Sequence, residues 1–155
     1  LICMLRRFAL HEEEETRTAS LPQLPRADFS NKRILLAEDN LLNQEIARTL
    51  LQNTRAHVET AADGREAVEM FAASFTGYYD LIFMDIQMPL MDGYQATRRI
   101  RAMNRPDAAT IPIVAMTANA FTEDIKLAMD AGMNQHMPKP IDIRQLETIL
   151  YRWLG

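Results

Sequence analysis

Short apolar runs alternate with amphipathic segments along most of this sequence, and this alternation limits the fold more than any other feature. Each apolar run has the length of a β-strand, and each segment between them carries apolar residues at helical spacing. Because strands that alternate with helices are joined by right-handed crossovers, they form a parallel sheet covered by helices on both faces. The sequence therefore predicts an α/β fold with five strands and five helices. We predict strands at 33–37, 57–61, 80–84, 111–117 and 135–138, and helices at 43–53, 63–73, 93–103, 122–132 and 143–154.

The polarity of each predicted strand indicates its place in the sheet. The first, third and fourth strands are almost continuously apolar, as expected for central strands, and the more polar second and fifth strands fit the edges. Residues 1–31 lack this pattern and contain an acidic block at Glu12–Glu15. We assign 1–31 to a linker or tail, partly disordered or with a short helix, and 32–155 to one folded domain.

The composition excludes several classes of protein. The formal net charge is −4 and no basic stripe is visible, which argues against nucleic-acid binding. Cys3 is the only cysteine, so no internal disulfide can form and a reducing, cytoplasmic compartment is expected. No apolar run approaches the roughly 20 residues that a membrane-spanning helix needs.

Polar side chains stand where four of the five predicted strands end. Glu38 and Asp39 follow the first strand, Asp85 the third, Thr117 the fourth and Lys139 the fifth. In an open parallel sheet the carboxyl ends of the strands meet at one edge, and ligands bind there where the winding direction reverses. We therefore expect these five side chains to converge on one site.

The chemistry of this set indicates phosphoryl transfer. Three carboxylates repel one another when they are close, so a cation is expected between them. Oxygen ligands suit Mg²⁺, and the sequence offers no His/Cys cluster for zinc. A metal and an ammonium group can neutralise the charge of a moving phosphoryl group, and an Asp carboxylate can itself become an aspartyl phosphate.

Four motifs at these strand ends resemble those of a known family. They are "AEDN" with "NQEIA", "DLIFMDIQMPLMDGYQATRRIR", "PIVAMTANA" and "HMPKPID". Together they resemble the receiver domain of two-component response regulators over residues 32–155. The resemblance implies a flavodoxin-like, doubly wound, five-stranded parallel sheet of strand order 2-1-3-4-5 with five helices.

The resemblance also implies a role for each acidic residue. Asp85 would be the phosphoacceptor. Mg²⁺ would be held by Asp39, Asp85 and the backbone carbonyl of Gln87, with Glu38 acting through a metal-bound water. Gln87 stands two residues after the phosphoacceptor, at a position that tunes the phosphate lifetime, and we hypothesise that its amide reaches the attacking water.

The remaining family positions concern the phosphoryl oxygens and the conformational switch. Thr117 and Lys139 would hold the phosphoryl oxygens, and a cis peptide between Lys139 and Pro140 would aim the ammonium into the site. In the family an aromatic ring on the fifth strand turns inward when the Thr hydroxyl moves to the phosphate. His136 stands at that position, usually Tyr or Phe, so here the predicted switch pairs Thr117 with an imidazole.

Within the family, "EDNxxNQ" and "MTANA" look most like receivers attached to hybrid histidine kinases. This likeness implies a histidine kinase or a histidine phosphotransfer domain as partner, and the cytoplasm as location, including the cytoplasmic part of a membrane-bound hybrid kinase. We expect no nucleic-acid binding by this domain, no direct membrane contact and a weak homodimer. The domain would be a signalling phosphoacceptor rather than an enzyme, although it would catalyse its own phosphorylation and dephosphorylation.

Two other functions compete with this one. A phosphohydrolase of the haloacid-dehalogenase type also uses an Asp nucleophile and Mg²⁺, but it needs a second Asp two residues later as general acid. That position is Gln87, which cannot donate and recover a proton in this role. A receiver-like scaffold that is never phosphorylated ranks lower, because all the required side chains are present.

Several residues near the site have simpler interpretations. Asp39 alone could cap a helix, but Asn40 is the better cap candidate, and Asp92 before Gly93 is predicted to be a turn residue rather than a ligand. Leu41 and Leu42 are predicted to be exposed, where together they could form a docking patch. We assign four methionines to the core, namely Met70, Met84, Met116 and Met129.

Overall fold

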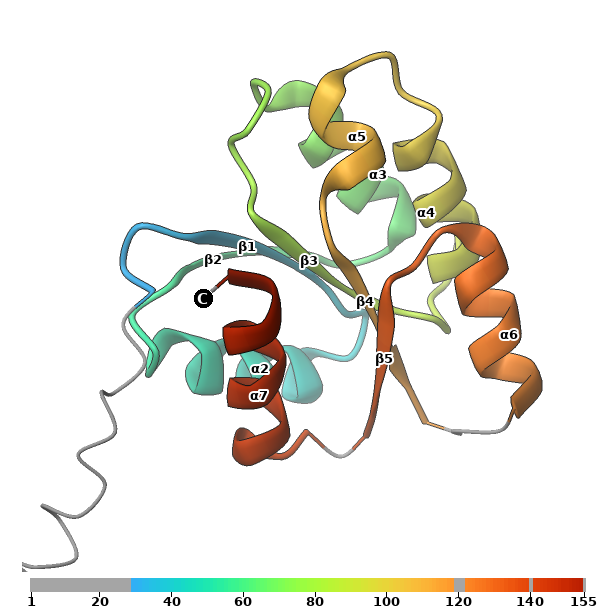
Figure 1. Ribbon diagram of the computed structural model, residues 1–155. Coiled ribbons are helices and arrows are strands. Elements are labelled where there is room, and N and C mark those ends of the chain that lie inside the picture. Colours follow the sequence, from blue (N-terminus) through green and yellow to red (C-terminus); the bar gives the residue numbers. More distant parts are fainter. Residues whose placement is uncertain (1–28, 119–121, 140, 155) are drawn as a thin grey trace, which may run out of the picture.

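The computed structural model describes residues 29–118, 122–139 and 141–154, and within them a five-stranded sheet lies between two layers of helices (Figure 1). The strands are β1 (Arg33–Ala37), β2 (His57–Ala61), β3 (Leu81–Asp85), β4 (Ile113–Thr117) and β5 (Gln135–Pro138). The helices are α2 (Leu41–Gln52), α3 (Gly64–Ala73), α4 (Gly93–Arg101), α5 (Pro106–Thr110), α6 (Thr122–Ala131) and α7 (Ile143–Leu154).

The sheet has the order β2-β1-β3-β4-β5, and all neighbouring strands are parallel. This confirms the predicted order and the doubly wound, flavodoxin-like topology. Helices α2 and α7 cover one face of the sheet, and α3, α4, α5 and α6 lie on the other (Figure 1). All five residues of β3 and of β4 are buried, as predicted for strands in the middle of the sheet.

The prediction of five helices was wrong, because the described part of the chain contains six. The additional helix is α5, which begins at Pro106. We predict no element between residues 103 and 111, and proline commonly ends a helix. However, proline lacks the N–H that the first helical turn leaves unpaired, so it can also begin a helix. The fourth strand is also shorter than predicted, since it starts at Ile113 rather than at residue 111.

Three of the four methionines assigned to the core are buried at least in part, and one is not. Met84 and Met116 are fully buried, and Met70 packs against the same core as Met84. Met129 is 42% exposed, so its assignment to the core was wrong. The buried stripe of α6 includes Ala128 and Ala131, and Met129 lies outside it.

Phe29 lies within the segment that we assigned to the linker, yet its side chain is buried. Its N–H donates a hydrogen bond of 2.9 Å to the carbonyl of Thr54, and its ring meets that of Tyr151 edge-on at 5.5 Å between centroids. The end of that segment therefore packs against α7 and the turn after α2. The expected short helix in 1–31 falls within residues 1–28, which lie outside the described residues.

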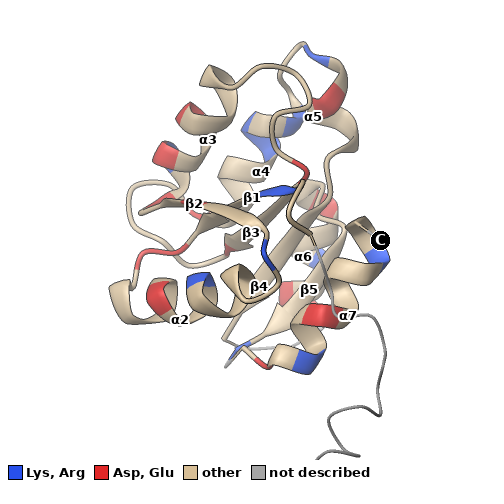
Figure 2. Ribbon diagram, turned by 90° about the vertical axis from the view of Figure 1, so that its left-hand side faces the viewer, with Lys and Arg blue, Asp and Glu red and all other residues tan. Residues whose placement is uncertain are grey.

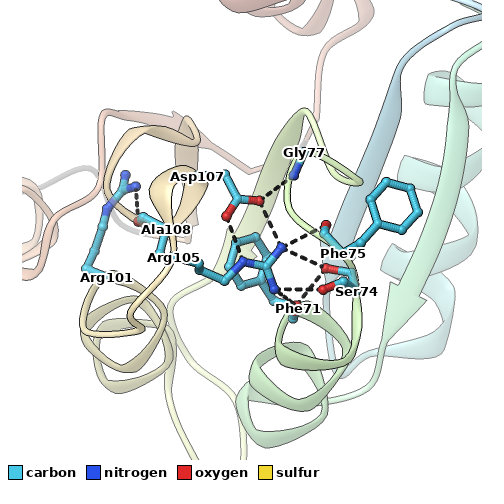
Figure 3. Close-up of polar contacts among 8 residues, drawn as sticks. All are labelled: Phe71, Ser74, Phe75, Gly77, Arg101, Arg105, Asp107 and Ala108. Carbon is cyan, nitrogen blue, oxygen red and sulfur yellow. Dashed lines mark hydrogen bonds and ion pairs between the residues drawn. The ribbon is translucent and has the colours of Figure 1, made fainter.

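Arg105 links α5 to the end of α3 (Figure 3). Its guanidinium donates hydrogen bonds to the backbone carbonyls of Phe71, Ser74 and Phe75, each 2.8 Å long. It also pairs with Asp107 at 2.7 Å and lies over the Phe71 ring at 4.4 Å from the centroid. One side chain thus adds hydrogen bonds to three carbonyls at and just after the end of α3, where the next turn of helix is missing.

Charged residues of both signs are distributed over several helices in Figure 2, and the end of α4 is basic, with Arg98, Arg99 and Arg101. In the part of the chain that the structure describes, every helix is too short or too polar to cross a membrane.

Candidate functional site

Three carboxylates come together where β1 and β3 end. Glu38, Asp39 and Asp85 each offer an oxygen atom, and these atoms all lie within 4.8 Å of one another. The sheet register explains their meeting, because Ala37 pairs with Met84 and the next residue of each strand is an acid. Glu38 and Asp85 are buried, whereas Asp39 is exposed at the mouth of the site.

Lys139 brings a positive charge to the two buried acids. Its Nζ lies 3.0 Å from Asp85 Oδ2 and 2.9 Å from Glu38 Oε2. Lys139 follows β5, and its backbone N–H donates to the carbonyl of Thr117 at 2.8 Å, which fixes the residue beside the end of β4. The Lys139–Pro140 peptide, which we expect to be cis, includes a residue outside the described part of the chain.

Burial and the crowding of charges set the pKa values of this cluster. Desolvation, together with the neighbouring Glu38, raises the pKa of Asp85 to about 7. Desolvation also acts against ionised Glu38, but hydrogen bonds from Lys139 and from the Asn40 N–H outweigh it and lower the Glu38 pKa. Burial disfavours the charged form of Lys139, yet hydrogen bonds to Glu38 and Asp85 raise the lysine pKa. The lysine therefore does not compensate for both buried carboxylates, and ionisation of Asp85 is disfavoured relative to that of an ordinary Asp.

The donor atoms match the preferences of Mg²⁺. Carboxylates from one exposed and one buried Asp face each other, and this ion takes one or two carboxylates and keeps several waters. Both oxygens of Glu38 already have partners, the Asn40 N–H at 3.1 Å and the Lys139 ammonium. No His or Cys belongs to the cluster found among the described residues, so zinc is not favoured.

The loop after β3 is held tightly against the site by two glycines. A Cβ on Gly93 would overlap the carbonyl oxygen of Asp85, and the Gly93 N–H donates to the Ile86 carbonyl at 2.9 Å. A Cβ on Gly64, at the start of α3, would overlap the carbonyl oxygen of Met91 in the same loop. Side chains larger than hydrogen at these positions would push the loop away from Asp85.

Two residues near the site cap helices; this was predicted for Asn40, whereas Asp92 was predicted to be a turn residue rather than a ligand. The Asn40 side chain accepts a hydrogen bond from the Asn43 N–H at 3.1 Å at the start of α2, so Asn40 rather than Asp39 is the cap. Asp92 accepts from the Gln95 N–H at 2.8 Å at the start of α4 and stays outside the carboxylate cluster.

A cavity of about 530 Å³ opens beside the carboxylates. Its lining includes Asp39, Gln87, Tyr94 and Thr117. Thr117 ends β4 next to Asp85, as predicted, and is buried. His136 lies one strand further out on β5, paired with Ala115, and does not line this cavity.

Tyr94 is a residue of this cavity that the sequence analysis missed. Its hydroxyl donates to the Asp124 carbonyl at 3.4 Å, and desolvation raises the pKa of the phenol. In the sequence, the position of Tyr94 directly after Gly93, in the first turn of α4, could have indicated that this residue lies near the site. Asp124 comes from α6, far along the chain, so spacing alone could not indicate this contact.

A sequence profile of the response regulator receiver domain matches residues 34–151, and the chain therefore belongs to this family. Among curated proteins, probable histidine kinase 2 of Oryza sativa subsp. indica is 44% identical over 124 residues. This match covers 73% of the present chain and 12% of the rice protein, so the chain spans a small part of that relative.

Solved structures of receiver domains have the same architecture. The receiver domain of sensor histidine kinase PA1611 from Pseudomonas aeruginosa PAO1, with a magnesium ion coordinated in its active-site cleft, is 40% identical with a TM-score of 0.72. That similarity covers 80% of this chain and 98% of the other. A chain from the co-crystal of the Saccharomyces cerevisiae histidine phosphotransfer protein Ypd1 with the Ssk1 receiver domain is 31% identical, with a TM-score of 0.71. Here 79% of this chain and 88% of the other are covered.

Proposed function

We propose that this receiver domain accepts a phosphoryl group from a phosphohistidine on Asp85. The Asp85 carboxylate would attack phosphorus, the P–N bond to the histidine would break, and its electron pair would return to the imidazole. The observation that carries this proposal is the position of Asp85, at the tip of a buried strand with Lys139 Nζ at 3.0 Å. A rigid strand presents the nucleophile, and positioning is the main source of catalysis in phosphoryl transfer.

Mg²⁺ would be held by Asp39, Asp85 and the backbone carbonyl of Gln87, with Glu38 acting through a water. The occupied oxygens of Glu38 support an indirect contact, and the exposed Asp39 supports binding of a hydrated ion. When bound, Mg²⁺ supplies charge neutralisation for the phosphoryl oxygens. The magnesium-bound PA1611 receiver supports this choice of ion.

Lys139 and Thr117 would bind the phosphoryl oxygens after transfer. Lys139 already lies against the acid that becomes phosphorylated, and Thr117 ends the neighbouring strand. Movement of the Thr117 side chain toward the phosphate would start the conformational switch, with His136 on β5 in the place of the usual aromatic ring. In this way the domain would catalyse its own phosphorylation and dephosphorylation while serving as a signalling module.

The source and destination of the phosphoryl group would be a histidine kinase or a histidine phosphotransfer domain. The rice relative is a histidine kinase, and a histidine kinase that carries a receiver is of the hybrid type. The Ssk1 receiver forms a co-crystal with the phosphotransfer protein Ypd1. A docking patch beside Asp39 also supports this partner, because Leu41, Leu42 and Ile46 on α2 are 75%, 68% and 45% exposed.

A transfer assay tests the proposal. The wild-type domain should acquire alkali-labile label from acetyl phosphate with Mg²⁺ and from a phosphorylated histidine phosphotransfer protein, whereas Asp85→Asn should acquire none. Label retained by Asp85→Asn would place the phosphate elsewhere. A wild-type domain that stays unlabelled by every donor would favour the scaffold alternative.

A further inference from the structure

Leu90 combines two unfavourable features in the loop after β3. Its φ is +67°, in the left-handed region that favours glycine and asparagine, and its side chain is 76% exposed. The Met91 N–H donates to the Pro89 carbonyl at 2.7 Å, which closes a three-residue γ-turn with Leu90 at its centre. A γ-turn with positive φ at its centre is rare and strained.

The contacts of the loop hold Leu90 in this conformation. Met91 is buried, and its carbonyl accepts a hydrogen bond of 3.2 Å from the Gly64 N–H. On the other side, Gly93 packs against the Asp85 carbonyl. The leucine thus gains little from burial, and its backbone would be less strained with glycine or asparagine. Folding of the domain alone gives no reason for a leucine at this position.

Leu90 lies close to the phosphoacceptor. Gly93 touches Asp85, and three peptide units of 3.8 Å bring Leu90 within about 11 Å of Gly93 along the chain. A standard protein interface covers about 800 Å² per partner, a disc of about 16 Å radius. A protein that delivers a phosphoryl group to Asp85 through such an interface therefore reaches Leu90.

We propose that Leu90 is a contact residue for the histidine phosphotransfer protein, buried against an apolar surface beside the phosphohistidine. This inference rests on the proposed function. A second copy of the chain is a poor occupant, because a symmetric contact here would bring Glu38, Asp39 and Asp85 toward their own copies. The same acids disfavour an anionic membrane surface.

Leu90→Asn tests the inference, because asparagine tolerates a positive φ but cannot replace the apolar contact. Met129→Ala is the matched control, since Met129 is also an exposed apolar residue but lies in the last turns of α6. Both variants and the wild type are compared in thermal unfolding, in phosphorylation by acetyl phosphate, and in affinity and transfer with histidine phosphotransfer proteins that include Ypd1.

For Leu90→Asn we expect a Tm that is unchanged or up to about 3 °C higher, and an unchanged rate with acetyl phosphate. Affinity for the phosphotransfer protein should fall roughly tenfold, as expected when a buried leucine is lost. Met129→Ala should match the wild type in affinity.

Three results would overturn the inference. The first is a Leu90→Asn variant that binds the phosphotransfer protein as tightly as the wild type, and the second is an equal loss of affinity in Met129→Ala. The third is a Leu90→Asn variant in which both the Tm and the rate of phosphorylation by acetyl phosphate fall, because Leu90 would then have a structural role. A wild type that binds the phosphotransfer protein but is never phosphorylated would instead contradict the proposed function, and the affinities would still decide the role of Leu90.

Discussion

At the scale of one residue, the buried carboxylate of Asp85 lowers the stability of the metal-free protein when it is ionised. Its native pKa of about 7 lies above the value of about 3.9 expected in the unfolded chain. Between these two values the native state binds more protons than the unfolded state, so stability falls as the pH rises through this range. The metal-free protein should therefore be more stable at pH 5 than at pH 8 as far as Asp85 is concerned.

Asp85→Asn removes the buried charge and should raise the free energy of unfolding in EDTA at pH 8 by about 1–3 kcal/mol. The gain should shrink at pH 5, where wild-type Asp85 is mostly protonated. Urea unfolding at both pH values measures the difference, with Asp130→Asn on the exposed side of α6 as control. If Asp85→Asn were less stable than the wild type at pH 8, the claim that the crowded carboxylates destabilise the metal-free protein would be wrong.

Arg105 is the opposite case, a residue that serves stability away from the site. Arg105→Lys keeps the charge but loses the planar fork that reaches three carbonyls and Asp107 together. We expect the free energy of unfolding to fall by about 1–3 kcal/mol. Arg98→Lys, on the exposed side of α4, is the control for the exchange itself. Arg105→Lys should still be labelled by acetyl phosphate. Loss of this labelling would show that the contacts of Arg105 also shape the site.

At the scale of elements, the end of β3 and the start of α4 depend on contact through Gly93. Gly93→Ala would place a Cβ against the Asp85 carbonyl, so the two elements must separate, and we expect a loss of about 2–4 kcal/mol and weaker Mg²⁺ binding. Gly77→Ala is an instructive control, because Gly77 has a φ of +84° but no atom near the added Cβ. It should cost only about 1 kcal/mol, from backbone strain, and leave Mg²⁺ binding intact. Equal losses in the two variants would show that the contact with Asp85 is unimportant.

The helices and strands also show how much of the fold can be predicted from the sequence alone. The strands and their central or edge positions follow from the apolar runs, whereas their full order followed only from the family resemblance. The meeting of Glu38 and Asp85 follows from the general rule that parallel strands end at one edge. In contrast, α5 was missed because one proline can end a helix or begin one. Local pattern does not distinguish these two roles.

The remaining features depend on partners that are distant in the sequence. Phe29 is fixed by Thr54 and Tyr151, and Tyr94 contacts Asp124. Such contacts carry no periodic signal, so composition and spacing could not reveal them. The strain at Leu90 likewise appears only when the loop is closed by Gly64 and Gly93.

At the scale of the whole molecule, the site should couple metal binding to folding. The metal-free fold brings together charges that the unfolded chain keeps apart, and an ion that binds only the native state stabilises it by mass action. At about 100 times the dissociation constant the gain is about 2.7 kcal/mol. The sequence places the acids on two different strands, so the gain requires the assembled sheet and not a local segment.

We therefore expect the Tm to rise with MgCl₂ concentration and then level off, when NaCl keeps the ionic strength constant so that screening does not change. Asp39→Asn should flatten this dependence, because Asp39 is the exposed carboxylate at the mouth of the cluster. Asp63→Asn is unsuitable as a control because Asp63 caps α3, whereas Asp130 has no such role among the described hydrogen bonds. Asp130→Asn should accordingly follow the wild-type curve. If Asp39→Asn followed it as well, the ion would be stabilising the fold from somewhere other than the edge where β1 and β3 end.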